Sequence, residues 1–381
     1  MARPTGKPLT AAGSNQWVRL AFYLLLLLPL LLRREPTPAN ELKYLQIADE
    51  ALRDGHFWCL YLDGAVYADK PPLYLWIVML FRQLLGFHCL PLLELFSLLP
   101  AFGILVLLNR WCGNRLTLRW QIGAELALLT TAYFLGGALV LRMDMLMVFF
   151  ITLAMWIFWR IDQGDPRPGL RWAFPLAVFA AIFSKGPVGM LFPLGGCLAW
   201  LLSEGRLRDF GRAWGWRCWL TLVLLCGFWW GMAWLEGGRD YIDNLLVHQT
   251  VGRAVDAFHH KRPIYWYLLV IWYAMGPWSL LTIPVGAWAA AKGRLKAPDL
   301  ALARYFLLIS ATFFVVMSLM SSKLQIYLLP MFGFVNYACY MILASTHQED
   351  HSTVVLTVTY AVAGTMLAAC VVAGFFFPSI F

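Results

Sequence analysis

The chain has 381 residues, of which 61% are hydrophobic and only 13% are charged. Soluble domains contain about 45–50% apolar and about 25% charged residues, so this composition excludes a soluble globular protein. It also excludes disordered, coiled-coil, collagen-like and nucleic-acid-binding classes. The aromatic share of 16%, with 19 Trp, is typical of membrane interfaces. The formal net charge of +9 is then either a basic patch for an anionic partner or a topology signal.

Eleven apolar stretches meet or approach the roughly 20 residues that a membrane-spanning helix needs. A twelfth, 73–87, is shorter and carries Arg82 and Gln83, which predicts an interfacial or half-inserted helix. We therefore expect an all-α integral membrane protein, a single membrane-embedded unit over 1–381 with no soluble C-terminal domain. The expected spans lie near 17–33, 91–108, 121–140, 145–160, 171–184, 187–203, 217–236, 265–290, 304–320, 324–344 and 352–377.

The distribution of charge gives these spans a direction. With a cytoplasmic N-terminus and alternating spans, seventeen of the thirty Lys and Arg residues fall in cytoplasmic segments, and most acids fall on the opposite side. This is the positive-inside pattern, and counting 73–87 as a full span would break it. The basic residues concerned are Arg3, Lys7, Arg19, Arg110, Arg115, Arg119, Arg160, Arg167, Arg171, Arg206, Arg208, Arg212, Arg217, Lys292, Arg294, Lys296 and Arg304.

Two external loops are long. The first, about 34–72, contains a stretch from Asn40 to Arg53 with an apolar face beside an acidic one, which predicts a helix lying along the membrane surface. The second, about 237–264, is rich in His, Arg and Asp. Both belong to the side that carries the acids.

Candidate functional side chains converge on that same side. Each one also fits a simpler reading: a lysine at a helix end can snorkel, and neighbouring unlike charges can form an interfacial ion pair of small energy. A site is favoured because five separate loops place a carboxylate or a cation on one face, where ionisable groups are costly and usually paired or functional. The candidates are Asn40, Glu41, Lys43, Tyr44, Tyr67, Asp69, Lys70, Arg142, Asp144, Lys185, His248, Arg253, His260, Lys323 and Tyr327.

Carboxylates beside several cations suit one kind of chemistry. A substrate with a phosphodiester needs positive groups, or a metal ion, to stabilise the departing phosphate. A hydroxyl acceptor needs a carboxylate as general base. Aromatic side chains such as Tyr44, Tyr67 and Trp266 can pack against a sugar ring or a polyprenyl chain.

The motifs that carry these residues have a recognisable order. The sequence resembles the GT-C superfold of multispanning glycosyltransferases over about residues 35–335, and is similar to the lipid A aminoarabinose transferases and the dolichyl-phosphate-mannose protein mannosyltransferase group. The elements concerned are Asn40-Glu41-Leu42-Lys43-Tyr44, Tyr67-Ala68-Asp69-Lys70-Pro71, Asp144, Ser184-Lys185-Gly186-Pro187, His248 with Arg253 and His260, Pro263 with Tyr265 to Tyr267, Gly276-Pro277-Trp278, and Ser322-Lys323-Leu324 with Tyr327 and Pro330.

The resemblance implies an inverting glycosyltransferase of a bacterial inner membrane, with its active site facing the periplasm. The donor would be a sugar on polyprenyl (undecaprenyl) phosphate, and the acceptor a lipid A-like lipid or a glycan, with membrane lipids around it and no nucleic acid. Glu41, Asp69 and Asp144 would be the catalytic acids, and the remaining candidates would bind substrate. A divalent metal ion (Mg2+, Mn2+ or Zn2+) at the carboxylates stays an open alternative.

Two departures from the family pattern bear on the chemistry. Asn40 stands where the family has an Asp, and an amide cannot act as a general base, so Glu41, Asp69 or Asp144 would take that role unless the acceptor is itself an anion. The additional external domain of the aminoarabinose transferases is also absent from the sequence. A polyprenyl-linked sugar transporter and a non-catalytic envelope-assembly protein are the alternatives. Transporters usually show inverted repeats and interrupted helices near the midplane, whereas here the charged residues gather at one face and no repeat is seen.

Overall fold

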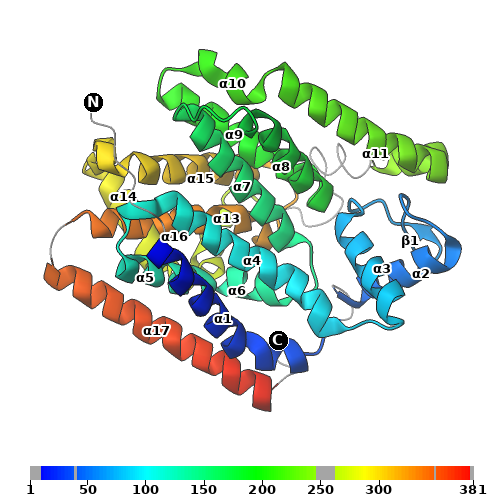
Figure 1. Cartoon of the computed structure of the whole chain (residues 1–381), viewed down its shortest axis with the longest axis horizontal. Coiled ribbons are helices and arrows are strands. Elements are labelled where there is room, and N and C mark those ends of the chain that lie inside the picture. The colour runs from blue at the N-terminus through cyan, green and yellow to red at the C-terminus, as the bar shows by residue number, and fades with distance from the viewer. Residues whose placement is uncertain (1–9, 38–40, 246–261, 347–348, 378–381) are drawn as a thin grey trace.

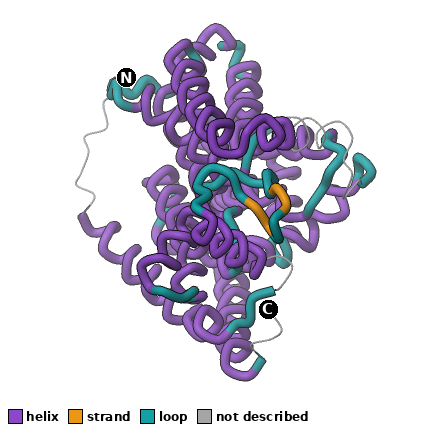
Figure 2. Tube along the Cα trace, turned by 90° about the vertical axis from the view of Figure 1, so that its right-hand side faces the viewer, coloured by secondary structure: helices purple, strands orange, loops and turns teal. Residues whose placement is uncertain are grey.

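The computed structural model describes residues 10–37, 41–245, 262–346 and 349–377. Within these ranges the chain is a bundle of helices with one short β-hairpin at its end (Figures 1 and 2). The bundle helices are α1 (Thr10–Arg33), α4 (Leu90–Cys112), α5 (Leu118–Leu129), α6 (Ala132–Leu139), α7 (Asp144–Asp162), α8 (Leu170–Lys185), α9 (Val188–Ser203), α11 (Trp216–Asp243), α13 (Trp266–Ala274), α14 (Ser279–Ala291), α15 (Ala301–Leu319), α16 (Leu329–Ala344) and α17 (Glu349–Phe376).

Every one of the eleven apolar stretches coincides with a helix or a helix pair, but a count of eleven spans is not confirmed. Among the described residues, seven helices are long and apolar enough to cross a membrane, and nine if each of two bent pairs counts as one span. The bent pairs are α5 with α6, at 70°, and α13 with α14, at 120°. Helices α8 and α9 have 16 residues each, about 24 Å at 1.5 Å per residue, which is short of a 30 Å hydrocarbon core.

The turn between α8 and α9 brings the end of one helix against the start of the next. Gly186 has φ +99° and Pro187 cannot continue the helix, so α8 ends at Lys185 as the Ser184–Pro187 motif predicts. A Cβ on Gly189 would lie 2.3 Å from the Ala181 carbonyl carbon, so the two helices approach this closely only with glycine there. The turn fixes where the Lys185 side chain can reach.

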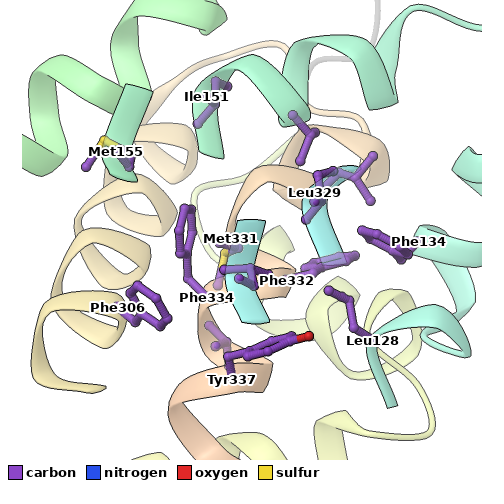
Figure 3. Close-up of a cluster of buried hydrophobic side chains, with 14 of the residues drawn as sticks. Leu128, Phe134, Ile151, Met155, Phe306, Leu329, Met331, Phe332, Phe334 and Tyr337 are labelled. Carbon is purple, nitrogen blue, oxygen red and sulfur yellow. The ribbon is translucent and has the colours of Figure 1, made fainter. Parts of the chain in front are cut away.

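Helix α16 forms the centre of the bundle. Its residues from Leu329 to Ile342 are all buried, because α5, α14 and α15 pack around it. Figure 3 shows Phe332 and Tyr337 of this helix on the side of Leu128 of α5, and Phe334 on the side of Phe306 of α15. This tightly packed core supports the helix ends that carry the polar residues described below.

The first external loop folds into a small cap at one end of the bundle, on the right of Figure 1. It contains α2 (Lys43–Asp54), strands β1 (Tyr61–Leu62) and β2 (Ala65–Val66), and α3 (Leu73–Leu85). The two strands pair antiparallel. The predicted amphipathic helix is confirmed as α2: Ile47 and Ala48 are buried against α3 while Asp49 is exposed. The apolar stretch 73–87 is likewise a helix, α3, of 13 residues.

Candidate active site

Asp144, at the start of α7, is the centre of a buried cluster of charges. Its carboxylate is fully buried and accepts hydrogen bonds from Arg142 Nε at 2.9 Å and from Lys185 Nζ. Arg142 lies in the segment between α6 and α7, and Lys185 is the last residue of α8. Two cations from different helix ends therefore share one carboxylate, and the sequence prediction that these three residues lie on one side of the bundle is consistent with this geometry.

Two tyrosines and a second acid lie around the cluster. The Lys185 ammonium lies 5.0 Å from the centre of the Tyr327 ring, a cation–π contact. Burial raises the pKa of Tyr44 to about 12, against the opposing charge of Arg142, and the carboxylates of Asp144 and Asp69 act in the same direction as burial. The Tyr44 hydroxyl donates to the Met143 sulfur at 3.8 Å. Tyr44 of the first loop thus lies within electrostatic reach of both Asp144 and Asp69.

A cavity of about 250 Å³ opens on the Lys185 side of the cluster. Its polar residues come from three separate parts of the chain, and apolar residues of α9, α11 and α15 complete its wall. The cavity thus combines charged and apolar lining residues, as an amphiphilic ligand requires. It is lined by Ala68, Asp69, Lys70, Pro71, Ile182, Lys185, Gly186, Pro187, Val188, Leu191, Trp229, Trp230, Leu245, Met317, Met320, Ser322 and Tyr327.

A second cavity, of about 330 Å³, lies on the Arg142 side. The Arg142 side chain is about 20% exposed and reaches this cavity while its Nε binds Asp144. Asp144 therefore connects two cations, each of which faces a different cavity. The second cavity is lined by Thr37, Glu41, Ala132, Tyr133, Gly136, Gly137, Val140, Arg142 and Ile326.

Glu41 lies beside the second cavity and is held on every side. Arg34 donates to both of its carboxylate oxygens, at 2.6 and 2.9 Å, and the backbone N–H groups of Thr37 and Leu141 donate to it at 2.8 and 2.7 Å. Burial raises the pKa of Glu41, but these hydrogen bonds outweigh it and hold that pKa below its ordinary value. Glu41 is therefore an ionised carboxylate that is hydrogen-bonded by other residues of the chain. Its predicted contact with substrate stays a prediction.

The other predicted substrate-binding residues lie in different places. Lys70 lines the first cavity. The Lys43 ammonium lies 5.4 Å from the centre of the Tyr44 ring. Lys323 is buried, donates to the carbonyl oxygens of Arg262, at 3.1 Å, and Met320, and its pKa is lowered by burial. Asn40, His248, Arg253 and His260 lie outside the described residues.

Several residues of the site were not predicted from the sequence. Arg34 follows the first apolar stretch, where a basic residue reads as an ordinary membrane anchor. Glu94, an acid inside the apolar run of α4, binds Arg34 at 2.5 Å and was a detectable signal, since buried acids in apolar helices are rare. Ser97 and the cavity-lining Trp229 and Trp230 carry no signal that distinguishes them from their neighbours.

The metal alternative finds little support in the described part of the chain. Among those residues no group of three or more His, Cys, Asp or Glu side chains is placed to hold a metal ion. Glu41 already accepts five hydrogen bonds, and Asp144 is bound by two cations. The cations of the chain are the groups available for an anionic substrate.

A helical bundle capped by a folded first loop, with two cavities meeting at a buried Arg–Asp–Lys cluster, has the GT-C fold of multispanning membrane proteins. The crystal structure of ArnT from Cupriavidus metallidurans bound to undecaprenyl phosphate matches with a TM-score of 0.76 over 93% of this chain and 64% of that chain, at 20% identity. The apo structure of the same protein matches with a TM-score of 0.73 at 19% identity. The fold prediction is confirmed.

Comparisons of sequence agree with the comparison of folds. The chain is 29% identical over 321 residues to undecaprenyl phosphate-alpha-4-amino-4-deoxy-L-arabinose arabinosyl transferase 1 of Pseudomonas fluorescens, which covers 82% of this chain and 54% of the relative. The Pseudomonas aeruginosa enzyme of the same kind is 28% identical over 317 residues, covering 82% and 56%. An uncharacterized protein of Aquifex aeolicus is 25% identical over 300 residues, covering 76% and 56%. No family model matches the chain.

The chain spans little more than half the length of these curated relatives. The similarity nevertheless confirms the resemblance to the aminoarabinose transferase group that the motifs indicate. Together with the long apolar helices, it supports a multispanning protein of a bacterial inner membrane.

Proposed function

We propose that the protein is an inverting glycosyltransferase that moves a sugar from undecaprenyl phosphate to a lipid, or to another envelope acceptor. The observation that carries this proposal is the position of Asp144, buried between two cations that face separate cavities. A transferase needs one site for a donor and one for an acceptor with the reacting atoms between them. The relatives named for this reaction support the donor class.

The first cavity fits the donor. Lys70 and Lys185 bring positive charge to it, and Tyr327 lies against Lys185, so a phosphate in the cavity would be met by charge-assisted hydrogen bonds. Trp229 and Trp230 of α11 give an apolar wall along which a prenyl chain can lie. The cations stabilise the charge that collects on the phosphate as it leaves.

The second cavity fits the acceptor. An acceptor oxygen held near Arg142 would attack the anomeric carbon of the sugar as the bond from that carbon to the phosphate oxygen breaks. One such displacement inverts the anomeric configuration and releases undecaprenyl phosphate. A hydroxyl acceptor would pass its proton to a general base, while an acceptor that is already an anion needs none. Asp144 then orients Arg142 and Lys185 toward the two substrates.

The side of the membrane follows from charge. The cap formed by α2, the β-hairpin and α3 lies at the end of the bundle that the positive-inside pattern assigns to the periplasm (Figure 1). Both cavities include residues of the first external loop and its flanks, such as Thr37 and Asp69. A periplasmic site with a cytoplasmic N-terminus is therefore part of the proposal.

The test uses the full chain in proteoliposomes with undecaprenyl-phosphate 4-amino-4-deoxy-L-arabinose and lipid A. Mass spectrometry should find the sugar added to the acceptor and free undecaprenyl phosphate formed in equal amount. A screen of other undecaprenyl-phosphate sugars and envelope lipids identifies the substrates if this pair does not react. Movement of the donor across the bilayer without any new glycolipid would contradict the proposal and favour a transporter.

A further inference from the structure

We propose that Arg34 and Glu41 are positioning residues that hold the segment 140–143, and through it Arg142, in place for the transfer reaction. The inference rests on the proposed function. The segment 140–143 joins α6 to α7 and has extended backbone at Val140, so its conformation depends on contacts with the rest of the chain. Glu41 Oε1 accepts a 2.7 Å hydrogen bond from the backbone N–H of Leu141, next to Arg142.

Glu41 is fully committed to this contact. Oε1 accepts from Arg34 and Leu141, and Oε2 accepts from Arg34 and from both the backbone N–H and the hydroxyl of Thr37, at 2.8 and 3.0 Å. An ionised carboxylate has about four lone-pair positions, so these five hydrogen bonds occupy its accepting capacity. Glu41 would have to give up a contact with the chain before it could accept a proton or bind substrate.

Arg34 is held just as firmly on its other side. Its side chain is 1% exposed, and one terminal nitrogen reaches both Glu41 at 2.6 Å and Glu94 of α4 at 2.5 Å. Glu94 thereby ties the end of α1 to α4. One turn further along α4, the Ser97 hydroxyl donates to the carbonyl oxygen of Val140 at 2.6 Å and lies 2.9 Å from that of Arg142.

The segment is therefore gripped from two directions, by Glu41 on the Leu141 N–H and by Ser97 on the neighbouring carbonyl groups. The side chains of Arg34, Glu41 and Glu94 are each about 1% exposed, and burying three charges costs free energy. A role in fixing the conformation of the segment 140–143 would account for that cost. The residue whose direction depends on that geometry is Arg142, because its Nε must meet Asp144 while its side chain faces the acceptor cavity.

The prediction is a loss in kcat without a matching loss in donor binding. Arg34→Met leaves Glu41 without its cation, and Glu41→Gln replaces one of the two carboxylate oxygens by an NH2 group, which cannot accept from Arg34 or from the Thr37 N–H. Each should lower kcat on the order of 10- to 100-fold, the size expected when reacting groups are displaced by about an ångström. The Kd for undecaprenyl phosphate alone should change by less than about threefold, because Lys70 and Lys185 are untouched. Arg34→Lys, which keeps the charge, should recover part of the lost kcat.

Two other arginines serve as matched controls. Arg19→Met breaks a buried Arg–Glu pair elsewhere in the bundle, and Arg33→Met removes the exposed neighbouring charge, which lies against Phe375. Both should keep kcat within about twofold per folded molecule, although Arg19→Met lowers Tm.

Two results would overturn the inference: wild-type kcat in both Arg34→Met and Glu41→Gln, or an equal kcat loss in Arg19→Met at the same loss of Tm. Ser97→Ala gives a further check if Arg34→Met does not fold, since it releases the segment from the other side. An absence of transfer by the wild-type protein would instead count against the proposed function, so the two failures are distinguishable.

Discussion

Two buried charge clusters in this molecule look alike but are built differently. In the first, Asp144 binds Arg142 and Lys185, and each cation also lines a cavity. In the second, Glu125 of α5 accepts two hydrogen bonds from Arg19 of α1, at 2.6 and 2.8 Å. The second cluster lines neither of these two cavities.

The second cluster is closed on itself. Glu125 also accepts from Tyr23, at 3.1 Å, and from Asn109, which in turn accepts from the Tyr337 hydroxyl at 2.9 Å. These contacts join α1, α4, α5 and α16, so the cluster holds helices together. Burial of an ion pair therefore does not mark a functional site by itself, and the proposed site differs in that both of its cations also line cavities.

The largest expected effect comes from Asp144. Asp144→Asn keeps the shape of the side chain but removes the charge that holds Arg142 and Lys185 in opposite directions. Transfer should fall on the order of 10³-fold, because both substrates lose oriented cations at once. The measurement is kcat with purified protein in liposomes, with circular dichroism to confirm folding. Transfer by Asp144→Asn at the wild-type rate would show that the Asp144 cluster, like the Glu125 cluster, is not needed for the reaction.

A smaller loss is expected at the donor cavity. Lys185→Met removes one of the two lysines that face it, while Asp144 keeps its contact with Arg142. The affinity for undecaprenyl phosphate should fall about 100-fold, the size of a charge-assisted contact to phosphate. Titration of undecaprenyl phosphate against the detergent-purified variant measures it. Lys292→Met, at an exposed position after α14, is the charge-matched control and should bind normally.

The closed cluster should respond in the opposite way. Arg19→Met strands the Glu125 charge among α1, α4 and α5 and should lower the free energy of unfolding by about 3 kcal/mol. The kcat of the folded fraction should stay within about twofold. Thermal unfolding and the transfer assay on the same preparation give both numbers. A strong loss of kcat with unchanged Tm would show that this cluster also takes part in function.

The smallest expected effect is a pH dependence of stability from Glu41. Because its folded-state pKa lies below its ordinary value of 4.5, its contribution to stability is complete above that value and is lost as pH falls through the lower, folded-state pKa. The Tm of Glu41→Gln should therefore lie below that of the wild type at pH 7, by a few degrees, and the gap should narrow only as the pH falls below 4.5. A gap that stays constant would contradict an ionised, hydrogen-bonded Glu41.

Much of the fold was predictable, because a bilayer requires long apolar helices. The stretch 145–160 appears as α7, and the Ser184–Pro187 motif ends α8 as its glycine and proline predict. The number of spans was less predictable, since the stretches 171–184 and 187–203 form helices of only 16 residues each, which is short for a membrane span. Hydropathy finds apolar segments but does not show how far each one reaches across the membrane.

The site was predictable only in part, for a related reason. The side of the membrane on which Asp69, Asp144 and Lys185 lie follows from counting spans, so their convergence could be expected. The binding of Glu41 by Arg34 could not, because it depends on how the ends of α1 and α4 pack against the first external loop. Such tertiary contacts have no period or motif in the sequence.

The most direct test of the central claim is sugar transfer measured side by side for the wild type, Asp144→Asn and Arg19→Met, in liposomes with undecaprenyl-phosphate aminoarabinose and lipid A. We expect a glycosylated acceptor from the wild type and from folded Arg19→Met, and almost none from Asp144→Asn. Equal transfer by all three would contradict that claim, as would the failure of the wild type to transfer any undecaprenyl-phosphate sugar to any envelope lipid.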